Sequence, residues 1–397
     1  MAGIDALRFF CLLMALCLYA LFGSSTPDHP GVWEVVVGAA LLLAAGVPAA
    51  FEIIKINGSR FLWLRSLFLF GLLVPFAIGV GKGAELTLIL RDMAAFFFLT
   101  LPLFFTDLIS EKAAYMKFFE WALAGAGVVF ALRALGPFYG YMAPSQELLY
   151  LANSPLVLFA ALFLFGKVFE ILHKGPALRN LFWAGLAGAA LFILLSSMLL
   201  DVQRATLGAT LLTACALVSV SFVRSPLRSL FPVFVLIVVI FLTLPFLQEA
   251  FHSVSLKTAQ VGLNMRLQEA RAVVTSVSGS FGSVLFGLGW GAEFASPAVG
   301  GISVNFTHSL LTYMFLKTGL AGLSLTLIYL GTVFRRLYAV FVEDVSLGFS
   351  LLWPLLIPVF LYASHKSLDF GLILLLIYIA GAKPGSSLLS IPAKTAV

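Results

Sequence analysis

The residues best suited to chemistry lie on one long polar, glycine-rich stretch, from about Leu244 to Leu323, which interrupts an almost continuous series of apolar segments. Long irregular loops in compact proteins tend to be lids or binding loops. His308 stands near the end of the stretch, directly before an apolar segment, and an unperturbed imidazole titrates at about pH 6.5. We therefore expect the functional site here, with His308 as a general base that removes a proton. The alternative is a structural histidine at a helix end.

Arginines accompany this histidine. Arg204 opens an apolar segment within Gln203-Arg204-Ala205, and Arg266 and Arg271 lie on the polar stretch itself. Arg204 either snorkels to the membrane surface or faces the site. The second reading is favoured because Arg204 lies at the outer end of its segment, where positive charge is otherwise avoided. Arg266 and Arg271 are five residues apart and point in partly different directions on a helix, so we expect at most one of them at the site.

Two further cations fall inside apolar segments. Arg91 lies about seven residues into its segment, which places it on the order of 10 Å below the surface at 1.5 Å per residue. An ionisable residue at such a depth costs roughly 2.5–3.5 kcal/mol and normally faces the bundle interior or a wet cavity. Lys317 also either has a structural partner or faces a wet cavity, and a structural role is favoured more for Lys317 than for Arg91.

The sequence lacks the residue patterns that several classes of functional site require. The outer side has no Asp-x-Asp pair, no Glu-His cluster and no convincing oxygen ligands for a divalent cation, so a phosphate-bearing substrate would have to be bound by arginines without metal. The run Gly287-Leu288-Gly289-Trp290-Gly291 lacks the strand and helix of a dinucleotide site. The positive charges are scattered singly, which argues against nucleic acid. The outer carboxylates follow no spacing that is typical of a particular site; they are Asp201, Glu249, Glu269 and Glu293. The sequence assigns no role to the other four histidines, His29, His173, His252 and His365.

The elements that must position these residues are membrane-spanning helices. The chain of 397 residues is 61% hydrophobic and only 11% charged, with a mean hydropathy of +1.07, which is typical of a polytopic membrane protein. We expect an all-α transmembrane helical bundle forming a single integral domain over residues 1–397. Apolar runs predict about twelve spans, near residues 4–22, 32–54, 61–81, 85–108, 115–135, 147–171, 180–200, 204–222, 229–248, 309–333, 349–364 and 367–382.

The positive charges set the orientation. Most Lys and Arg residues in short loops fall on the side of the N-terminus, which is therefore expected to be cytoplasmic, as is the C-terminus. The loop at 249–308 then lies outside, in the periplasm of a bacterium. Within it, small apolar residues among Ser and Gly from Leu267 to Leu285 predict one or two interfacial amphipathic helices.

The order of these motifs resembles the bacterial O-antigen ligase and O-antigen polymerase superfamily, integral membrane glycosyltransferases of the GT-C type. The similarity covers roughly Leu195 to Leu330. Family members usually have Ser-Arg-Gly at the first motif and His-Asn at the last. The four matching parts are Gln203-Arg204-Ala205, Arg266 early in the loop, Phe286 to Gly291, and His308-Ser309 leading into Leu310 to Tyr313, with Thr318 to Gly322 behind.

The resemblance implies a function for each part. Such enzymes transfer a glycan whole from undecaprenyl diphosphate to an acceptor sugar hydroxyl at the periplasmic face of the inner membrane, with inversion and without metal or other cofactor. By this resemblance His308 is the catalytic base, and Arg204, Arg266 and Arg91 bind the diphosphate. Possible supporting residues are Arg271, Gln203, Ser309 and Lys317.

Two other functions stay open. In an O-antigen ligase the acceptor is the lipid A core, whereas a polymerase of O-antigen or exopolysaccharide repeat units uses another lipid-linked unit with the same donor and chemistry. A transporter of lipid-linked glycan belongs to a different class, which predicts two related halves and ionisable residues near the bilayer midplane. Here the ionisable residues gather at one face instead.

Overall fold

The computed structural model describes residues 2–24, 31–54, 61–143, 145–261 and 265–382, and the fold in these ranges is almost entirely α-helical. Eight helical segments are long and apolar enough to cross a membrane, which agrees with the expected polytopic bundle. They are α1 (Ala2–Phe22), α3 (Leu62–Gly81), the pair α4 (Leu86–Leu99) and α5 (Pro102–Ser110), α6 (Ala113–Tyr139), α8 (Pro155–His173), α9 (Leu178–Leu200), α10 (Arg204–Arg224) and α14 (Leu310–Glu343).

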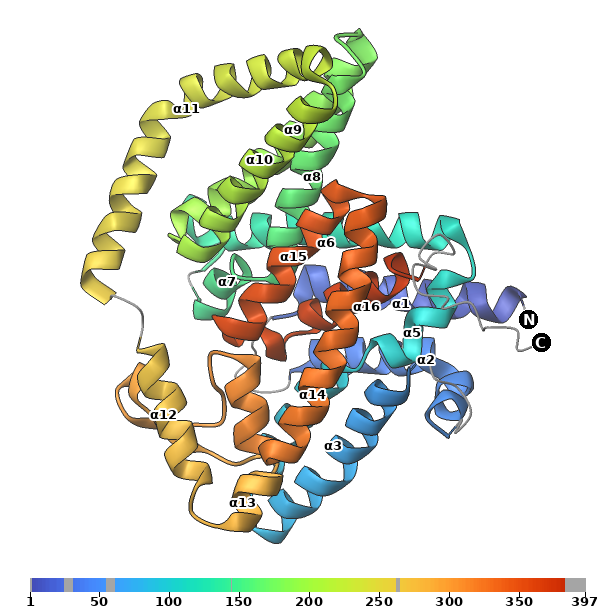
Figure 1. The fold of residues 1–397 in the computed structure, drawn as a ribbon, viewed down its shortest axis with the longest axis vertical. Coiled ribbons are helices and arrows are strands. Elements are labelled where there is room, and N and C mark those ends of the chain that lie inside the picture. Colours follow the sequence, from blue (N-terminus) through green and yellow to red (C-terminus); the bar gives the residue numbers. More distant parts are fainter. Residues whose placement is uncertain (1, 25–30, 55–60, 144, 262–264, 383–397) are drawn as a thin grey trace, which may run out of the picture.

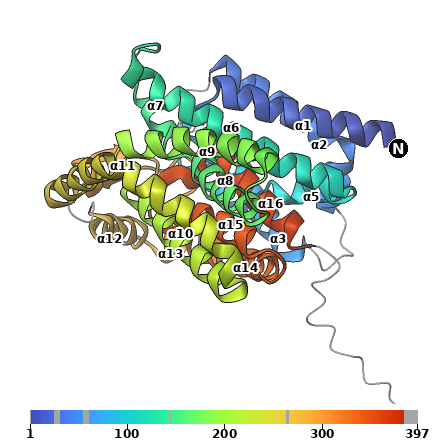
Figure 2. The same cartoon turned by 90° about the horizontal axis from the view of Figure 1, so that it is seen from above.

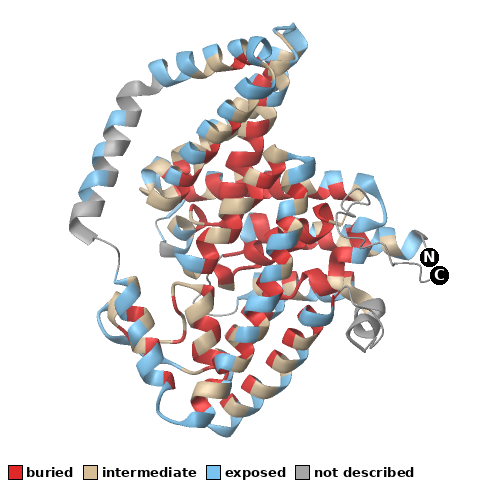
Figure 3. Ribbon diagram, in the orientation of Figure 1, coloured by how far each residue is buried: buried red, intermediate tan, exposed pale blue. Residues whose placement is uncertain are grey.

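Four shorter apolar helical segments occupy the other expected spans. The helix α2 (Val32–Ile54) is interrupted at Gly46, whose φ is 59°, and Val32–Gly46 is the apolar segment that precedes this break. Near the C-terminus, α15 (Val345–Phe360) and α16 (Leu368–Ala380) are short because the 3₁₀ turn η3 (Ala363–Lys366) separates them. Every residue of α16 is buried, so this helix forms the centre of the bundle (Figure 3).

The fourth short apolar segment belongs to a helix longer than the sequence predicts. Residues 229–248 are expected to cross the membrane and to end at a loop, but α11 (Pro226–Val261) continues for thirteen residues beyond this range. The added residues include Gln, Glu, Ala, Leu and Lys and no Gly or Pro, so nothing in the local sequence stops the helix at the membrane edge. Within this helix, Pro226–Phe241 is the apolar segment whose side chains the structure describes.

The polar stretch folds into two short helices and one hairpin. As expected, helices cover the segment after residue 265, namely α12 (Arg266–Val277) and α13 (Phe281–Phe286). The hairpin was not expected. It pairs β1 (Phe294–Ser296) with β2 (Ile302–Val304) in antiparallel register around η2 (Pro297–Val299).

Different elements lie at the two ends of the helical bundle. In Figure 1, α12 and α13 lie at the lower left, whereas the turn between α8 and α9 lies at the top and α1 begins at the right. Seen from above in Figure 2, the small helix α7 (Gln146–Leu151) lies toward the same end as α12, and α1 begins at the opposite end. The polar stretch therefore covers one end of the bundle.

The glycine-rich run is wedged between α3 and α14. Pro75 has no N–H to give to the carbonyl of Gly71 one turn earlier, and the indole Nε1 of Trp290 donates to that carbonyl instead, at 2.7 Å. On the other side, α14 breaks at Gly319 (φ 63°). The carbonyls of Leu316 and Lys317 accept hydrogen bonds from Leu288 and Gly289 at 2.9 and 3.0 Å.

Two of these glycines are required by close approach. A Cβ on Gly289 would lie 2.5 Å from the backbone nitrogen of Gly79, and a Cβ on Gly319 would lie 2.4 Å from that of Gly287. Their positive φ angles, 91° and 63°, add backbone strain for any other residue. The run thus serves backbone packing and fixes the start of the hairpin relative to the membrane helices.

Candidate functional site

His308 is held by a buried carboxylate. Its imidazole Nδ1 lies 2.8 Å from Oε1 of Glu269, and its backbone N–H donates to Oε2 at 3.1 Å. Ser296 of the hairpin donates to the same carboxylate at 3.0 Å. The side chain of Glu269 is only 3% exposed, while that of His308 is 18% exposed. A loop, a helix and a hairpin therefore meet at one carboxylate.

Local sequence explains how these two residues meet. On α12 the buried residues are Glu269, Val273 and Val277, spaced by four, and the two valines pack with Phe294 and Leu316. Ser309 caps α14 by accepting a hydrogen bond from the backbone of Thr312 at 3.2 Å. The cap fixes the chain direction immediately after His308.

The electrostatics determine which imidazole nitrogen is available. Burial raises the pKa of Glu269, but the hydrogen bonds and charge interaction with His308 and the bond from Ser296 outweigh it, so the pKa is lowered overall. The ionised carboxylate can only accept, so Nδ1 of His308 donates. In the described part of the chain no residue hydrogen-bonds to Nε2. This nitrogen is the one that can take a proton from a substrate.

Arg266 lies within electrostatic range of both Glu269 and Arg204. Burial lowers the pKa of Arg266; Glu269 and Tyr362 oppose this shift, and repulsion from Arg204 adds to it. Tyr362 follows α15 and lies within electrostatic range of both arginines; burial raises the pKa of its hydroxyl. The structure thus brings the two arginines to one place from α10 and α12.

The turn η3 lies within electrostatic range of His308. His365 is buried, with its ring 5.1 Å from that of Tyr313, and it lies within electrostatic range of His308. Burial and repulsion from Lys366 lower the pKa of His365 to about 3, so its imidazole is neutral at pH 7. Burial also lowers the pKa of Lys366, to about 8. Arg91 is half-buried and within electrostatic range of Lys366.

Lys317 has a structural partner. Its Nζ lies 2.6 Å from Oδ2 of Asp92 and donates to the carbonyl of Ala292 at 2.5 Å. Asp92 also accepts from the hydroxyl of Tyr313 at 3.0 Å and from the N–H of Gly291 at 2.8 Å. Both charged side chains of the pair are fully buried. This cluster ties α4 and α14 to the glycine-rich run.

The other expected residues fall in different places. Arg271 is exposed on α12, away from the face that carries Glu269. Gln203 is buried, and its amide donates to the carboxylate of Asp201, next to Arg204. Sequence reasoning missed Glu269 and the turn that carries Tyr362, His365 and Lys366. For Glu269 the available signal was its spacing of four and eight residues from Val273 and Val277.

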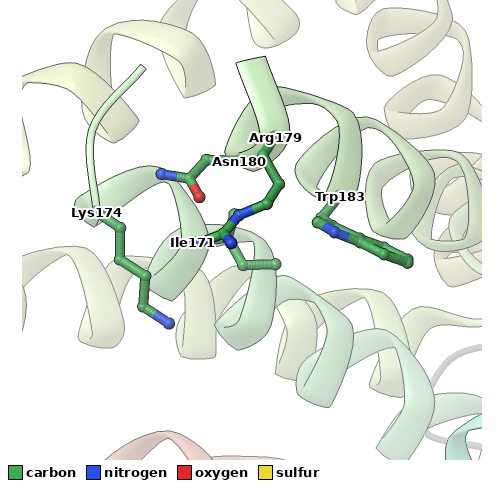
Figure 4. A pocket seen from close by; sticks show the side chains of 5 residues that line it. All are labelled: Ile171, Lys174, Arg179, Asn180 and Trp183. Atoms are coloured by element: carbon green, nitrogen blue, oxygen red, sulfur yellow. The ribbon is translucent and has the colours of Figure 1, made fainter. Parts of the chain in front are cut away.

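Two cavities of the described chain lie elsewhere. One, of about 290 Å³, is a hollow at the turn between α8 and α9, lined by Lys174, Arg179 and Trp183 together with Ile171 and Asn180 (Figure 4). This turn is at the end of the molecule opposite α12. The second lies where α1 ends and α2 begins. Neither contains His308.

Fold and site define a multi-pass helical membrane protein with a carboxylate–histidine pair and two arginines together at one end of its bundle. No protein-family model matches the chain, and no curated protein matches it.

Proposed function

We propose that the protein is a glycosyltransferase of the O-antigen ligase type, which moves a glycan from undecaprenyl diphosphate to a sugar hydroxyl of the lipid A core. The observation that carries this proposal is the Glu269–His308 pair, with Nε2 unengaged, beside Arg204 and Arg266. A base that removes a hydroxyl proton and cations that receive a diphosphate leaving group are the two requirements of this reaction.

In the proposed reaction, the acceptor oxygen attacks the anomeric carbon of the donor sugar from the face opposite the diphosphate. The new glycosidic bond forms as the bond from the anomeric carbon to the diphosphate oxygen breaks, which inverts the configuration. The acceptor proton goes to Nε2 of His308, and Glu269 stabilises the resulting imidazolium. Arg204 and Arg266 stabilise the charge that develops on the diphosphate. No step requires a metal ion.

The proposal includes a location and topology. We infer that α2, α11, α15 and α16 complete about twelve spans with the eight longer segments, in a bacterial inner membrane with both termini in the cytoplasm. The site then faces the periplasm. The clustering of the described site residues at the end formed by α12 and the start of α14 supports a site at the membrane surface, since lipid-linked glycans are long polar chains that a site in the bilayer interior would not accommodate. The excess of Lys and Arg in the loops on the side of the N-terminus supports the periplasmic side for this site.

The test is reconstitution of the purified protein in vesicles with undecaprenyl-diphosphate glycan and a lipid A core acceptor, with mass analysis of the products. We expect ligated product in the presence of a chelator, and a loss of about 10²- to 10⁴-fold with His308→Ala. Arg204→Ala should also abolish most product while the protein still elutes as a folded species. Arg271→Ala, an exposed arginine on the same helix as Arg266, is the matched control and should retain activity.

The same assay separates the other functions. Longer lipid-linked chains formed without the acceptor lipid would identify a repeat-unit polymerase. Movement of donor across the vesicle membrane without any new glycosidic bond would identify a transporter. Ligated product at an unchanged rate with His308→Ala would overturn the proposed mechanism.

A further inference from the structure

A second polar cavity lies away from His308, where α1 ends and α2 begins. It has a volume of about 270 Å³ and is lined by an aromatic pair, two carboxylates and one guanidinium. They are Phe22, Trp33, Glu34, Glu147 and Arg133, with Gly23, Ser24, Gly31 and Leu148 completing the wall.

The aromatic pair offers a flat apolar face. Phe22 and Trp33 stack with ring centroids 4.1 Å apart and planes within 12°. Because Phe22 covers only one side of the indole, Trp33 remains 42% exposed. An interfacial tryptophan of the membrane belt would explain this exposure alone. It would not explain why the indole shares a cavity with three ionisable side chains.

Hydrogen bonds hold Arg133 and Glu34 in position, and these groups are only partly engaged. Arg133 donates through Nη1 to the carbonyls of Ala20 and Gly23 at 2.9 and 2.8 Å, which holds its guanidinium at the end of α1. One oxygen of Glu34 accepts from the N–H of Gly31 at 3.0 Å. Glu147 lies within electrostatic range of Arg133. A guanidinium has five N–H donors and each carboxylate two accepting oxygens, so both kinds of group keep hydrogen-bonding capacity.

This combination matches the chemistry of a sugar ring. A pyranose presents C–H groups that pack on an aromatic face, as apolar surfaces do, and hydroxyls that both donate and accept. Carboxylates accept from the hydroxyls, and a guanidinium donates to hydroxyl and ring oxygens. The volume is close to the lower end of the roughly 300–1,000 Å³ of small-molecule sites. It fits one or two sugar units and is too small for a whole glycan.

The cavity also lies at the appropriate end of the molecule. Its wall includes the start of α7, and α7 and α12 lie toward the same end in Figures 1 and 2. With the orientation given under Proposed function, this end faces the periplasm, where the glycan substrates are. The hollow of Figure 4 lies at the other end and contains no carboxylate.

We propose that this cavity is a saccharide-binding subsite that holds a sugar unit of a glycan substrate at a distance from the reacting bond. The identity of the bound glycan rests on the proposed function, whereas the binding of a sugar in this cavity does not. Trp33 packs against the sugar ring, Glu34 and Glu147 accept from its hydroxyls, and Arg133 donates to its oxygens. Binding energy from a part of the substrate remote from the reaction would select the correct glycan and position it.

The test is direct binding of free oligosaccharides, which contain no diphosphate and cannot react. Two probes distinguish the possible sources, namely the glycan released by mild acid from the lipid-linked donor and the core oligosaccharide released from lipopolysaccharide. Saturation-transfer NMR on the full-length protein in detergent measures both. We expect one probe to bind. Trp33→Ala, which removes the face that packs on the sugar ring, and Glu147→Gln, which removes a charged hydrogen-bond acceptor, should each weaken this binding by about tenfold or more.

Matched controls keep this proposal separate from the proposed function. Trp183→Ala removes an exposed tryptophan at the opposite end and should leave binding unchanged. His308→Ala should abolish transfer and leave oligosaccharide binding intact. Binding of neither probe to the wild-type protein, or equal binding by the Trp33→Ala variant, would overturn the saccharide subsite whatever the transfer assay shows. Binding that depends on Trp33 without any transfer activity would support the subsite and reject the proposed enzyme.

Discussion

Glu269 carries two hydrogen bonds from a single residue, His308, through the backbone N–H at 3.1 Å and the imidazole Nδ1 at 2.8 Å. The carboxylate thereby sets both the position of the loop and the tautomer of the ring. The first of these functions needs one acceptor oxygen. The second needs another acceptor oxygen facing Nδ1, which an amide lacks, and the stabilisation of an imidazolium needs a negative charge. The two can be separated by substitution.

Glu269→Gln is expected to separate them. An amide of the same size retains an oxygen that accepts from the backbone N–H, but it cannot stabilise an imidazolium. We expect the fold to persist and the transfer rate to fall by about 10²- to 10⁴-fold, the usual contribution of general-base catalysis. Single-turnover kinetics with the lipid-linked donor measure this loss. Ser296→Ala, which removes one neutral hydrogen bond to Glu269, should have a much smaller effect. Equal rates for wild type and Glu269→Gln would exclude the proposed role.

The second prediction concerns the buried charges around Asp92, which faces both Lys317 and Lys366 at 2.6 and 3.4 Å. Asp92→Asn leaves two ammonium groups without a counter-charge, and breaking a buried pair in this way costs about 3–5 kcal/mol. Lys317→Met leaves Asp92 with Lys366, Tyr313 and the N–H of Gly291. We therefore expect Asp92→Asn to lower the unfolding temperature in detergent more than Lys317→Met. The reverse order would show that Lys366 does not compensate for Lys317.

The third prediction uses the hydrogen bond from Trp290 to Gly71. Trp290→Phe removes the only side-chain donor described for the carbonyl of Gly71, to which Pro75 has no N–H to donate. An unsatisfied buried carbonyl costs about 1–3 kcal/mol of folding stability. Pro75→Ala supplies a helical N–H for the same carbonyl. The double variant should therefore lose less stability than the sum of the two single changes, as a thermal double-mutant cycle in detergent can measure. Strict additivity would mean that the indole contributes packing alone.

Particular residues show how far the sequence could predict this arrangement. Single-residue chemistry and hydropathy lead to His308, Arg204 and Arg266 and to a helical membrane bundle, because each depends on local composition. Glu269 depends on which face of α12 is buried, and its valine neighbours at four and eight residues are also typical of an ordinary amphipathic helix. Contacts such as Asp92 with Lys317 join residues far apart in the sequence. Their pairing follows from helix packing that no local pattern encodes.

The fourth prediction concerns acid pH. His365 has a pKa of about 3 in the folded protein, against about 6.5 in an unfolded chain. Between these values the unfolded chain binds the proton and the folded protein does not, so the free energy of unfolding falls as the pH drops from 6.5 towards 3. The lowered pKa of Glu269 acts in the same direction, since its stabilisation is present above the unfolded pKa and is lost as the pH falls through the folded value.

A substitution isolates the histidine in this effect. The groups around His365 are Tyr313, Lys366, Asp92 and His308. We expect His365→Gln to flatten the dependence of the unfolding temperature on pH between 6.5 and 5. His252→Gln, at an exposed position on α11, should leave it unchanged. An unaltered slope in His365→Gln would assign the acid sensitivity to Glu269 or to other groups.

The last prediction concerns how the arginines bind the donor. Arg204→Lys and Arg266→Lys keep the positive charge but lose the planar pair of donors that matches phosphate oxygens. If the diphosphate is bound by paired hydrogen bonds, each variant should raise the KM for the lipid-linked donor by about tenfold, corresponding to roughly 1.4 kcal/mol, and leave the KM for the acceptor unchanged. Arg271→Lys, at an exposed position on the same helix as Arg266, is the control and should change neither. Full activity in both lysine variants would show that charge alone is sufficient, and a rise in the acceptor KM instead would place the arginines on the acceptor.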